Sequence, residues 1–477
     1  MGRHDGVPDV LLDARTRRGG AGLWEIHGGA DAASHPGHPA DRCPHHAGIG
    51  VLAVPAPLRW GARRADADTD GSGIRVRRAG RAARLPAGNR RDATRHDAVH
   101  GMKRALRIIK RIMIITGAPI LLLAAVIFFY MRQPQFGKTP SGEGLARIER
   151  SPHYKNGRFH NLVEKPTVSE GYSTSGEIYN TFFKEYPRRS PIDSLPSVKS
   201  DLLKLPADSN VAVWFGHSSV FIQVDGKRIL VDPSFSGRGS PLPGSAKAYK
   251  GSNIYSAADM PPIDYLFISH DHYDHLDYET VVALRDKVKH VVCGLGVGQH
   301  FEHWGYAPEQ IIEKDWYEKI EVDSGFTIYT ESSHHESGRG FARDKTLWMS
   351  YLIQAPGLRI YVGGDGGYDG RFAEIEKKFG PVDWAIMDTG QYDKAWQSVH
   401  LLPEEVRQAT LELKARHLLP VHHSKYTLGK HAWDEPLIRA TELSASQPYR
   451  VATPMIGEVV YLNNPSQPFK EWWKGVK

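Results

Sequence analysis

Cysteine is scarce in this chain, since its 477 residues contain only Cys43 and Cys293. Two cysteines exclude a disulfide framework and a zinc module built from cysteines. Cys293 lies in the apolar run Val291-Val292-Cys293, where a buried free thiol is the expected state. The cysteine content therefore leaves the redox compartment open.

Lysine is absent from the first 100 residues, which hold 16 arginines against 11 acidic residues, a net charge of +5. Residues 1–101 are rich in Arg, Gly, Ala, Pro, Asp and His and have no helical or strand periodicity. We interpret them as a mis-assigned leader before a true start at Met102, or as a genuine disordered basic tail. Both interpretations predict no fold for this segment, and the arginine bias favours the first.

A net positive charge is also missing from the chain after its first 111 residues. Five cations lie between Lys103 and Arg111, which leaves a net charge of about −3 from Ile112 onward, given the total of +7. A nucleic-acid-binding domain needs a basic surface. We therefore expect no nucleic acid as a partner.

The chain has one long uncharged run, the 19 residues from Ile112 to Tyr130, enough to cross a bilayer core of roughly 30 Å. A cleavable signal peptide would have a shorter apolar run and a small-residue cleavage site. A buried core helix would lack the dense basic flank. We predict a signal anchor over residues 102–131, with the N-terminus cytoplasmic and the later domain periplasmic or otherwise extracytoplasmic.

Residues 132–210 are polar with scattered prolines, and we expect them to form a linker and an N-terminal arm. From residue 211 onward, β-rich runs alternate with helical stretches, which predicts a layered α/β or α+β domain over residues 211–470. The expected strands are 211–215, 220–224, 228–232, 265–268, 290–293, 326–329, 348–354, 359–362 and 384–387. The expected helices include 278–288, 370–379 and 403–413.

Motifs for covalent catalysis and nucleotide binding are absent. The chain has no Gly-x-Ser-x-Gly nucleophile motif, no Walker A loop and no dinucleotide fingerprint. The glycines at 294, 296 and 298 lack the fingerprint's spacing and its acidic partner, so we predict a turn there. The chemistry must come from other side chains.

A cluster of metal-ligand side chains follows the expected strand that ends near Ser269. His270, His272, Asp274 and His275 fall within six residues. Alternate residues of an extended segment point the same way, so His270 and His272 can reach one ion, while Asp274 and His275 can reach a second. Imidazole with carboxylate suits zinc, with iron or manganese also compatible. A solvated loop that is His-rich by chance does not account for this spacing.

Further candidate ligands also lie at expected strand ends. They are His334 or His335, Asp365 in a run of four glycines, and His422 or His423. Glycines beside Asp365 would let the backbone approach a bound ion closely. Each feature is weak alone, but their order after the cluster predicts a closed two-metal site.

This pattern resembles the metallo-β-lactamase superfamily, and in particular the branch of N-acylphosphatidylethanolamine phospholipase D and its bacterial relatives. The resemblance covers roughly residues 145–465 and implies an αββα four-layer sandwich preceded by one transmembrane helix. The supporting motifs are 214–219, 231–233, the His cluster, 337–340, 364–368, 400–405 and the upstream segments 151–154 and 157–161. One departure is Glu336, where the family tends to have an aromatic residue.

The resemblance also implies a role for each candidate. One metal would be held by His270, His272 and His335, and the second by Asp274, His275 and His422. Asp365 would bridge the two metals, and Asp274 or Asp365 would shuttle a proton. His400 would support the site or contact substrate, and Asp232 and His217 would support the ligand loops.

The implied activity is hydrolysis of a phospholipid phosphodiester by a hydroxide held between two Zn²⁺ ions, next to a membrane. A lactonase, thioesterase or amide hydrolase with the same metal pair is the first alternative, because one fold hosts many reactions. A membrane-tethered protein with an inert metal site is the second. The sequence gives no basis for an oligomeric state.

We predict that metal analysis of the purified chain finds about two ions per chain, because seven ligands exceed the four of one structural zinc site. Inductively coupled plasma mass spectrometry measures this ratio. One ion or none would favour the inert binding protein.

Overall fold

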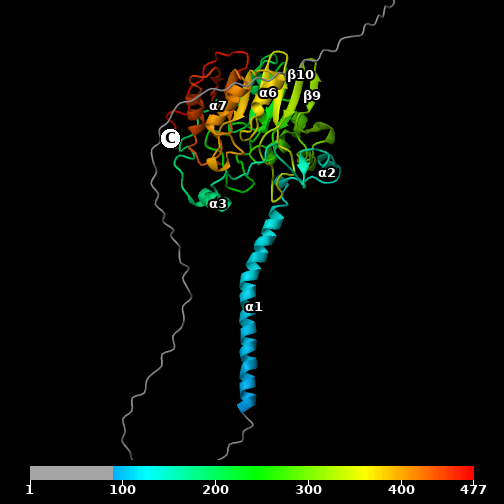
Figure 1. The fold of residues 1–477 in the computed structure, drawn as a ribbon, viewed down its shortest axis with the longest axis vertical. Coiled ribbons are helices and arrows are strands. Elements are labelled where there is room, and N and C mark those ends of the chain that lie inside the picture. The colour runs from blue at the N-terminus through cyan, green and yellow to red at the C-terminus, as the bar shows by residue number, and fades with distance from the viewer. Residues whose placement is uncertain (1–89) are drawn as a thin grey trace, which may run out of the picture. The chain divides into compact units, whose positions relative to one another are not determined.

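The computed structural model describes residues 90–477, so most of the predicted leader, residues 1–89, lies outside the described part (Figure 1). Helix α1 (Arg90–Tyr130) begins before Met102 and contains Pro119. Among the described residues one helix, Asp97–Tyr130, is long and apolar enough to cross a bilayer. Its apolar side chains are exposed, with none of its most apolar window buried against protein. The division of the chain into leader, anchor, arm and catalytic domain stays a prediction.

Two seven-stranded sheets make up the centre of the domain. The first has the order β16-β3-β4-β5-β6-β7-β8. Its strands are β3 (Val211–Trp214), β4 (Val220–Val224), β5 (Lys227–Val231), β6 (Ile263–Ile268), β7 (Val288–Gly294), β8 (Ile311–Lys314) and β16 (Val459–Tyr461). Neighbours from β5 to β8 pair in parallel, and β16, β3, β4 and β5 pair antiparallel.

The second sheet has the order β15-β14-β13-β12-β11-β10-β9. Its strands are β9 (Lys319–Asp323), β10 (Phe326–Glu331), β11 (Ser350–Gln354), β12 (Arg359–Val362), β13 (Trp384–Asp388), β14 (His417–Val421) and β15 (Arg450–Val451). Strands β12 to β15 are parallel, whereas β9 to β12 run as an antiparallel meander.

Three buried apolar clusters define four layers. The inter-sheet cluster joins side chains such as Ile222 and Phe267 to Ile353 and Ile386 of the second sheet. Helices cover the outer face of each sheet: α4 (Tyr278–Leu284) and α5 (Gly298–His303) on the first, α6 (Arg371–Phe379) and α7 (Pro403–Glu412) on the second. The remaining elements are α2 (Gly142–Ile148), α3 (Thr174–Phe183), α8 (Glu435–Ser444) and the two-stranded β1 (Tyr154–Lys155) and β2 (Arg158–Phe159). The predicted αββα sandwich of the metallo-β-lactamase type is confirmed.

Strand direction places one set of loops together. Strands β3, β5 and β6 all run the same way, because β4 is antiparallel to both β3 and β5. By the same reasoning β10 runs with β12, β13 and β14. An isolated bridge between His217 and His423 joins the loops that follow β3 and β14. The carboxyl ends of the site-bearing strands therefore meet at one edge of the sandwich.

The structure contains elements that the sequence pattern missed. The expected strands and helices are present within a few residues, although the strand expected at 348 begins at Ser350. The turn expected at the three glycines ends in a helix, α5, which begins at Gly298. Strands β8, β9 and β16 are short and less than fully buried, so their apolar pattern is weak. Cys293 is a buried free thiol, as expected.

We predict that Leu266→Ala lowers the free energy of unfolding by about 2–5 kcal/mol, because a fully buried leucine leaves a cavity under the helices. Urea denaturation of the full chain in detergent measures the change. Leu203→Ala is the matched control, since Leu203 is 62% exposed. Equal midpoints for the two variants would contradict this account of the core.

Candidate metal centre

The predicted ligands come together where the carboxyl edges of the two sheets meet. His270, His272, Asp274 and His275 follow β6 in the first sheet. Residues of the second sheet approach from the other side: His335 after β10, Asp365 after β12 and His422 after β14. Within the described residues, four groups of histidine and aspartate side chains have ligand atoms within 4.8 Å of one another, and two of these groups also include His217, Asp388 or His400.

Three imidazoles make the first half of the centre. Nε2 of His270 lies 2.9 Å from Nδ1 of His272, and Nε2 of His335 lies 3.3 Å from that same Nδ1. His334 is not part of this group, since its Nδ1 faces Asp369 at 3.8 Å. Of the two histidines that the sequence left open, the structure brings His335 into the cluster.

The second half gathers around Asp274. Its Oδ2 lies 3.5 Å from Nε2 of both His275 and His422. His423 points elsewhere, because its Nε2 is 3.2 Å from the carbonyl oxygen of Pro420 and its ring packs on Trp214. His422 is therefore the histidine of this pair that joins the cluster.

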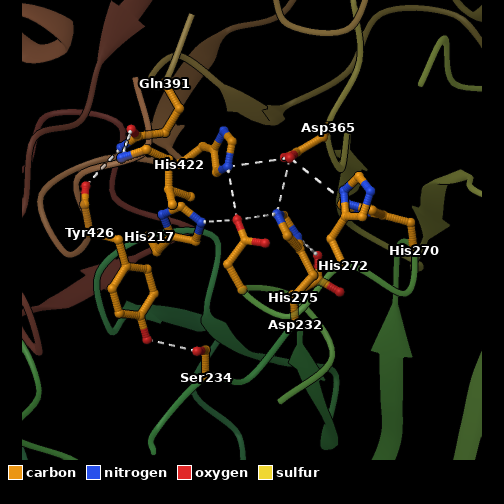
Figure 2. A network of polar contacts seen from close by, with 12 residues as sticks. His217, Asp232, Ser234, His270, His272, His275, Asp365, Gln391, His422 and Tyr426 are labelled. Atoms are coloured by element: carbon orange, nitrogen blue, oxygen red, sulfur yellow. Dashed lines mark hydrogen bonds and ion pairs between the residues drawn. The ribbon is translucent and has the colours of Figure 1, made fainter. Parts of the chain in front are cut away.

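Asp365 stands between the two halves (Figure 2). Its Oδ2 lies 3.0 Å from His275 Nε2 and 3.2 Å from His422 Nε2. The same oxygen is 3.9 Å from His270 Nε2 and 4.0 Å from His335 Nε2. This placement suits a carboxylate that contacts two ions at once.

Four of the candidate ligand rings, all except His272, have a partner on their other nitrogen, the arrangement typical of metal-binding histidines. His275 Nδ1 lies 2.9 Å from Asp232 Oδ2, and His335 Nδ1 donates to the carbonyl oxygen of Val399 at 2.9 Å. Asp232 also accepts hydrogen bonds from the backbone and hydroxyl of Ser269, which locks the start of the ligand loop. The supporting position expected for Asp232 matches these contacts.

His217 contacts the centre through the carboxylate of Asp274. Its Nε2 lies 2.8 Å from Asp274 Oδ2, and burial lowers its pKa to about 3, so the ring is neutral. A neutral ring donates one hydrogen bond to Asp274 and leaves that carboxylate its charge. This contact agrees with the expected support for a ligand.

Asp388 is a participant that the sequence pattern missed. It is the last residue of β13 and is 1% exposed. Its two oxygens lie 3.0 Å from His422 Nδ1 and 2.8 Å from His400 Nδ1. The carboxylate thereby sets the orientation of both rings. A lone aspartate at the end of an apolar strand was the signal, and it is too common a feature to single out.

The arm also supplies a contact to the centre. Asn161 donates to the carbonyl oxygen of His335 at 2.8 Å and accepts from its backbone N–H at 3.1 Å. Trp348 Nε1 donates to Oδ1 of Asn161 at 2.9 Å. The arm segment therefore fixes the backbone of one candidate ligand.

Burial and neighbouring charges have opposite effects on the pKa values in the cluster. Burial would raise the pKa of Asp274 and Asp365, but the nearby histidines, His275 first, hold both pKa values well below the ordinary range. Burial lowers the pKa of His422, yet Asp365 and Asp388 outweigh it and raise the value to about 10. The carboxylates thus remain anionic and draw in positive charge.

Buried atoms without hydrogen-bond partners test whether the residues fit metal ions. His275 Nε2, His422 Nε2 and Asp365 Oδ1 are buried and make no hydrogen bond of good geometry. Buried polar atoms normally have partners, and a bound cation in this cluster would supply one for these three. The donor set of imidazoles and carboxylates suits Zn²⁺, Fe or Mn.

Three of the residues that position the site have a left-handed backbone conformation. His217, Asp232 and His422 have φ values of 53°, 41° and 68°, in the left-handed region. Such conformations cost about 1–3 kcal/mol each and persist only where surrounding contacts fix them. The hydrogen bonds described above provide those contacts.

The glycines beside Asp365 allow neighbouring loops to approach closely. A Cβ on Gly364, whose φ is +59°, would lie 2.8 Å from Ser269 Cβ, and one on Gly367 would lie 2.2 Å from the Ser398 carbonyl oxygen. Their expected role beside a bound ion stays a prediction. The glycines let three loops pack together around the carboxylate.

An αββα sandwich with this histidine and aspartate cluster at the edge of its sheets defines a metal-dependent hydrolase. Residues 227–423 match the family described as "Beta-lactamase superfamily domain". The chain belongs to the metallo-β-lactamase superfamily, within the branch similar to N-acylphosphatidylethanolamine phospholipase D.

Three similar proteins illustrate the relationship. An uncharacterized protein of Mycobacterium tuberculosis is 33% identical over 332 residues, 68% of this chain and 88% of that protein. The N-acyl-phosphatidylethanolamine-hydrolyzing phospholipase D 1 of Caenorhabditis elegans is 30% identical over 232 residues, 46% of this chain and 65% of that protein. The solved metallo hydrolase Igni18 of Ignicoccus hospitalis has a TM-score of 0.40 at 19% identity, over 53% of this chain and 98% of that chain.

We predict that Asp388→Asn weakens metal binding by about 10–100-fold, because the amide cannot accept from both His400 and His422. Competition with a chromogenic chelator measures the metal dissociation constant. Asp286→Asn is the matched control, since that side chain is 89% exposed. Unchanged affinity in Asp388→Asn would mean that this carboxylate does not orient the ligands.

Proposed function

We propose that this protein is a membrane-anchored, binuclear metal-dependent phosphodiesterase that acts on phospholipids. The observation that supports it most directly is the cluster around Asp365, which has separate donor sets on its two sides. His270, His272 and His335 would hold one ion, and Asp274, His275 and His422 the other, with Asp365 shared. We infer two Zn²⁺ ions, with Fe or Mn as the alternatives that the same donors accept.

Two bound divalent cations would lower the pKa of a water molecule and neutralise the charge that develops on phosphoryl oxygens. Asp274 and Asp365 are anionic at neutral pH, so either carboxylate can accept a proton from that water. His400 is fixed to Asp388 through Nδ1, which leaves Nε2 as the ring nitrogen for substrate or leaving group. These positions support the proposed catalytic roles of Asp274, Asp365 and His400.

A cavity of about 410 Å³ lies beside the centre and is lined by His335 and Val399. Its charged lining is mixed, with Arg158 and Lys165 beside Glu164, Glu336 and Asp344. The two basic side chains are the groups there that can pair with the negative charge of a phosphodiester, a charge that a lactone lacks. Glu336, where the family tends to have an aromatic residue, also lines this cavity and pairs with Arg343 outside it.

Membrane anchoring rests on α1 and on the loops at its end. The Tyr130 hydroxyl donates to the carbonyl oxygen of Pro241, next to Leu242, which is 55% exposed. Phe341, which is 85% exposed, is adjacent to Gly340, where an added Cβ would lie 2.9 Å from Met131 Cε. Apolar side chains thus surround the point where the helix joins the domain. With the cationic flank on the cytoplasmic side, the catalytic domain is extracytoplasmic.

Three tryptophans that are too deeply placed to line an acyl groove belong to the core. Trp304, Trp316 and Trp348 are all buried, and each donates its indole N–H to a backbone oxygen. They are therefore unavailable to an acyl chain. Phe341 remains the exposed candidate.

We predict that the zinc-loaded full chain converts phosphatidylethanolamine vesicles to phosphatidate and free ethanolamine, and hydrolyses bis-p-nitrophenyl phosphate. Asp365→Asn should lower kcat/KM by at least about 100-fold, beyond the usual range for residues that only support ligands. Mass spectrometry of the lipid products and absorbance of p-nitrophenol measure these reactions.

Asp323→Asn is the control for that substitution, because Asp323 is 60% exposed on β9. Parallel assays use a γ-lactone and a thioester. Intact phospholipid and intact bis-p-nitrophenyl phosphate, together with an opened lactone or thioester, would replace the proposal with acyl hydrolysis.

A further inference from the structure

The segment that follows α1 lies against the metal-ligand loop. We call residues 133–141 the strap. The carbonyl oxygen of Pro134 accepts from Trp304 Nε1 at 2.8 Å. Further along, the Ser141 backbone exchanges two hydrogen bonds with Gln299, at 2.7 and 3.0 Å. The strap is therefore held along its length by the region that includes α5.

Arg339 joins the strap to the ligand loop. Its side chain is 4% exposed, and its Nε and NH2 both donate to the carbonyl oxygen of Gln135, at 3.1 and 2.7 Å. Its NH1 donates to the carbonyl oxygens of Asp271 and Leu276, at 2.8 and 2.7 Å. The guanidinium thus ties one strap carbonyl to both ends of the loop that contains His272, Asp274 and His275.

The same loop is held a second time through the side chain of Asp271. Its Oδ1 accepts from the Gly338 backbone at 2.7 Å, and its Oδ2 lies 3.3 Å from His300 Nε2. His300 Nδ1 accepts in turn from the Lys138 backbone of the strap at 3.0 Å. Asp271 lies between two candidate ligands, so both routes from the strap end at the metal centre.

These contacts require the geometry of arginine. The planar guanidinium of Arg339 has five N–H donors, and it donates to three backbone carbonyl oxygens at once. These oxygens stabilise its positive charge inside the protein. A lysine at this position has a single ammonium and cannot reach acceptors on both sides in that way. A cavity of about 160 Å³ between the strap and the loop at 338–346 means that side-chain packing alone does not fix the strap.

We propose that the strap positions the metal-ligand loop through Arg339, so that the segment joining the membrane helix to the domain sets how tightly the domain holds its metals. Arg339 is a positioning residue in this scheme and touches neither metal nor substrate. The inference rests on the proposed metal centre but not on the phosphodiester substrate, because metal release is the quantity to measure.

Gly137 offers a way to disturb the strap where it meets His300. Its φ is +66°, and an added Cβ would lie 2.1 Å from His300 Nδ1, so Gly137→Ala must shift the strap. Gly142, with φ +56° and open space around it, is the control for a Cβ added at a positive φ. Only the first substitution produces a clash.

The experiment uses the zinc-loaded full chain in detergent and follows the transfer of zinc to a chromogenic chelator. Gly137→Ala and Arg339→Lys should each speed zinc release by about tenfold or more, as for residues that support ligands. Gly142→Ala should release zinc at the wild-type rate. The urea midpoint of the metal-free proteins is measured in parallel, because a merely structural role would lower that midpoint in proportion.

A double variant gives the sharpest outcome. Because Gly137→Ala displaces the strap from both Arg339 and His300, it should add less in the Arg339→Lys background than in the wild type, so that the combined effect falls below the product of the single effects. Fully multiplicative effects, or wild-type release from Gly137→Ala, would overturn the inference. A wild-type chain that binds no zinc would overturn it together with the proposed metal centre, whereas zinc binding without phosphodiesterase activity would contradict only the substrate proposal.

Discussion

The carboxylate of Asp365 is the point on which the arrangement of this domain depends. It reaches imidazoles from both sheets, with His275 at 3.0 Å and His422 at 3.2 Å. Asp232, Asp274 and Asp388 are buried nearby, and unpaired buried charge is costly in a protein interior. The two sheets can therefore close at this edge only if positive charge joins them. Protonated imidazole provides it in part, and metal ions would provide it fully.

The residues around Asp365 are held in place by backbone groups as well as by side chains. Asp232 holds Ser269 and His275 at once, and Asp388 holds two rings with two oxygens. The left-handed residues in the same loops show that local preference yields to these contacts. Most of the candidate ligand rings are thus held through their second nitrogen by neighbouring residues of the sandwich.

The features that could be predicted from the sequence are those that depend on residues close together in the chain. His270 to His275 lie within six residues, and the central strands have apolar runs, so the first ligand group and a layered α/β or α+β domain were predictable. The four-layer sandwich was implied by the family resemblance. Asp388 was not, because a single aspartate after an apolar strand has no distinctive neighbour. The partners of Arg339 are carbonyl oxygens, which every residue carries, so no residue type indicates the contact. The choice between His334 and His335 needed the resemblance, and only the structure places His334 beside Asp369.

Because of the strand directions, the site residues lie at one edge of the domain. We call the opposite edge, which holds none of them, the quiet edge. Site residues follow the carboxyl ends of β3, β5, β6, β10, β12, β13 and β14. The connections at the opposite edge, including residues 225–226, 324–325 and 356–357, are exposed and hold none of the site side chains. Exposed turns of this kind tolerate added length at small entropic cost. The quiet edge is thus where this enzyme can acquire an affinity tag, a fluorescent reporter or a whole inserted domain while the geometry of its chemistry stays as it is.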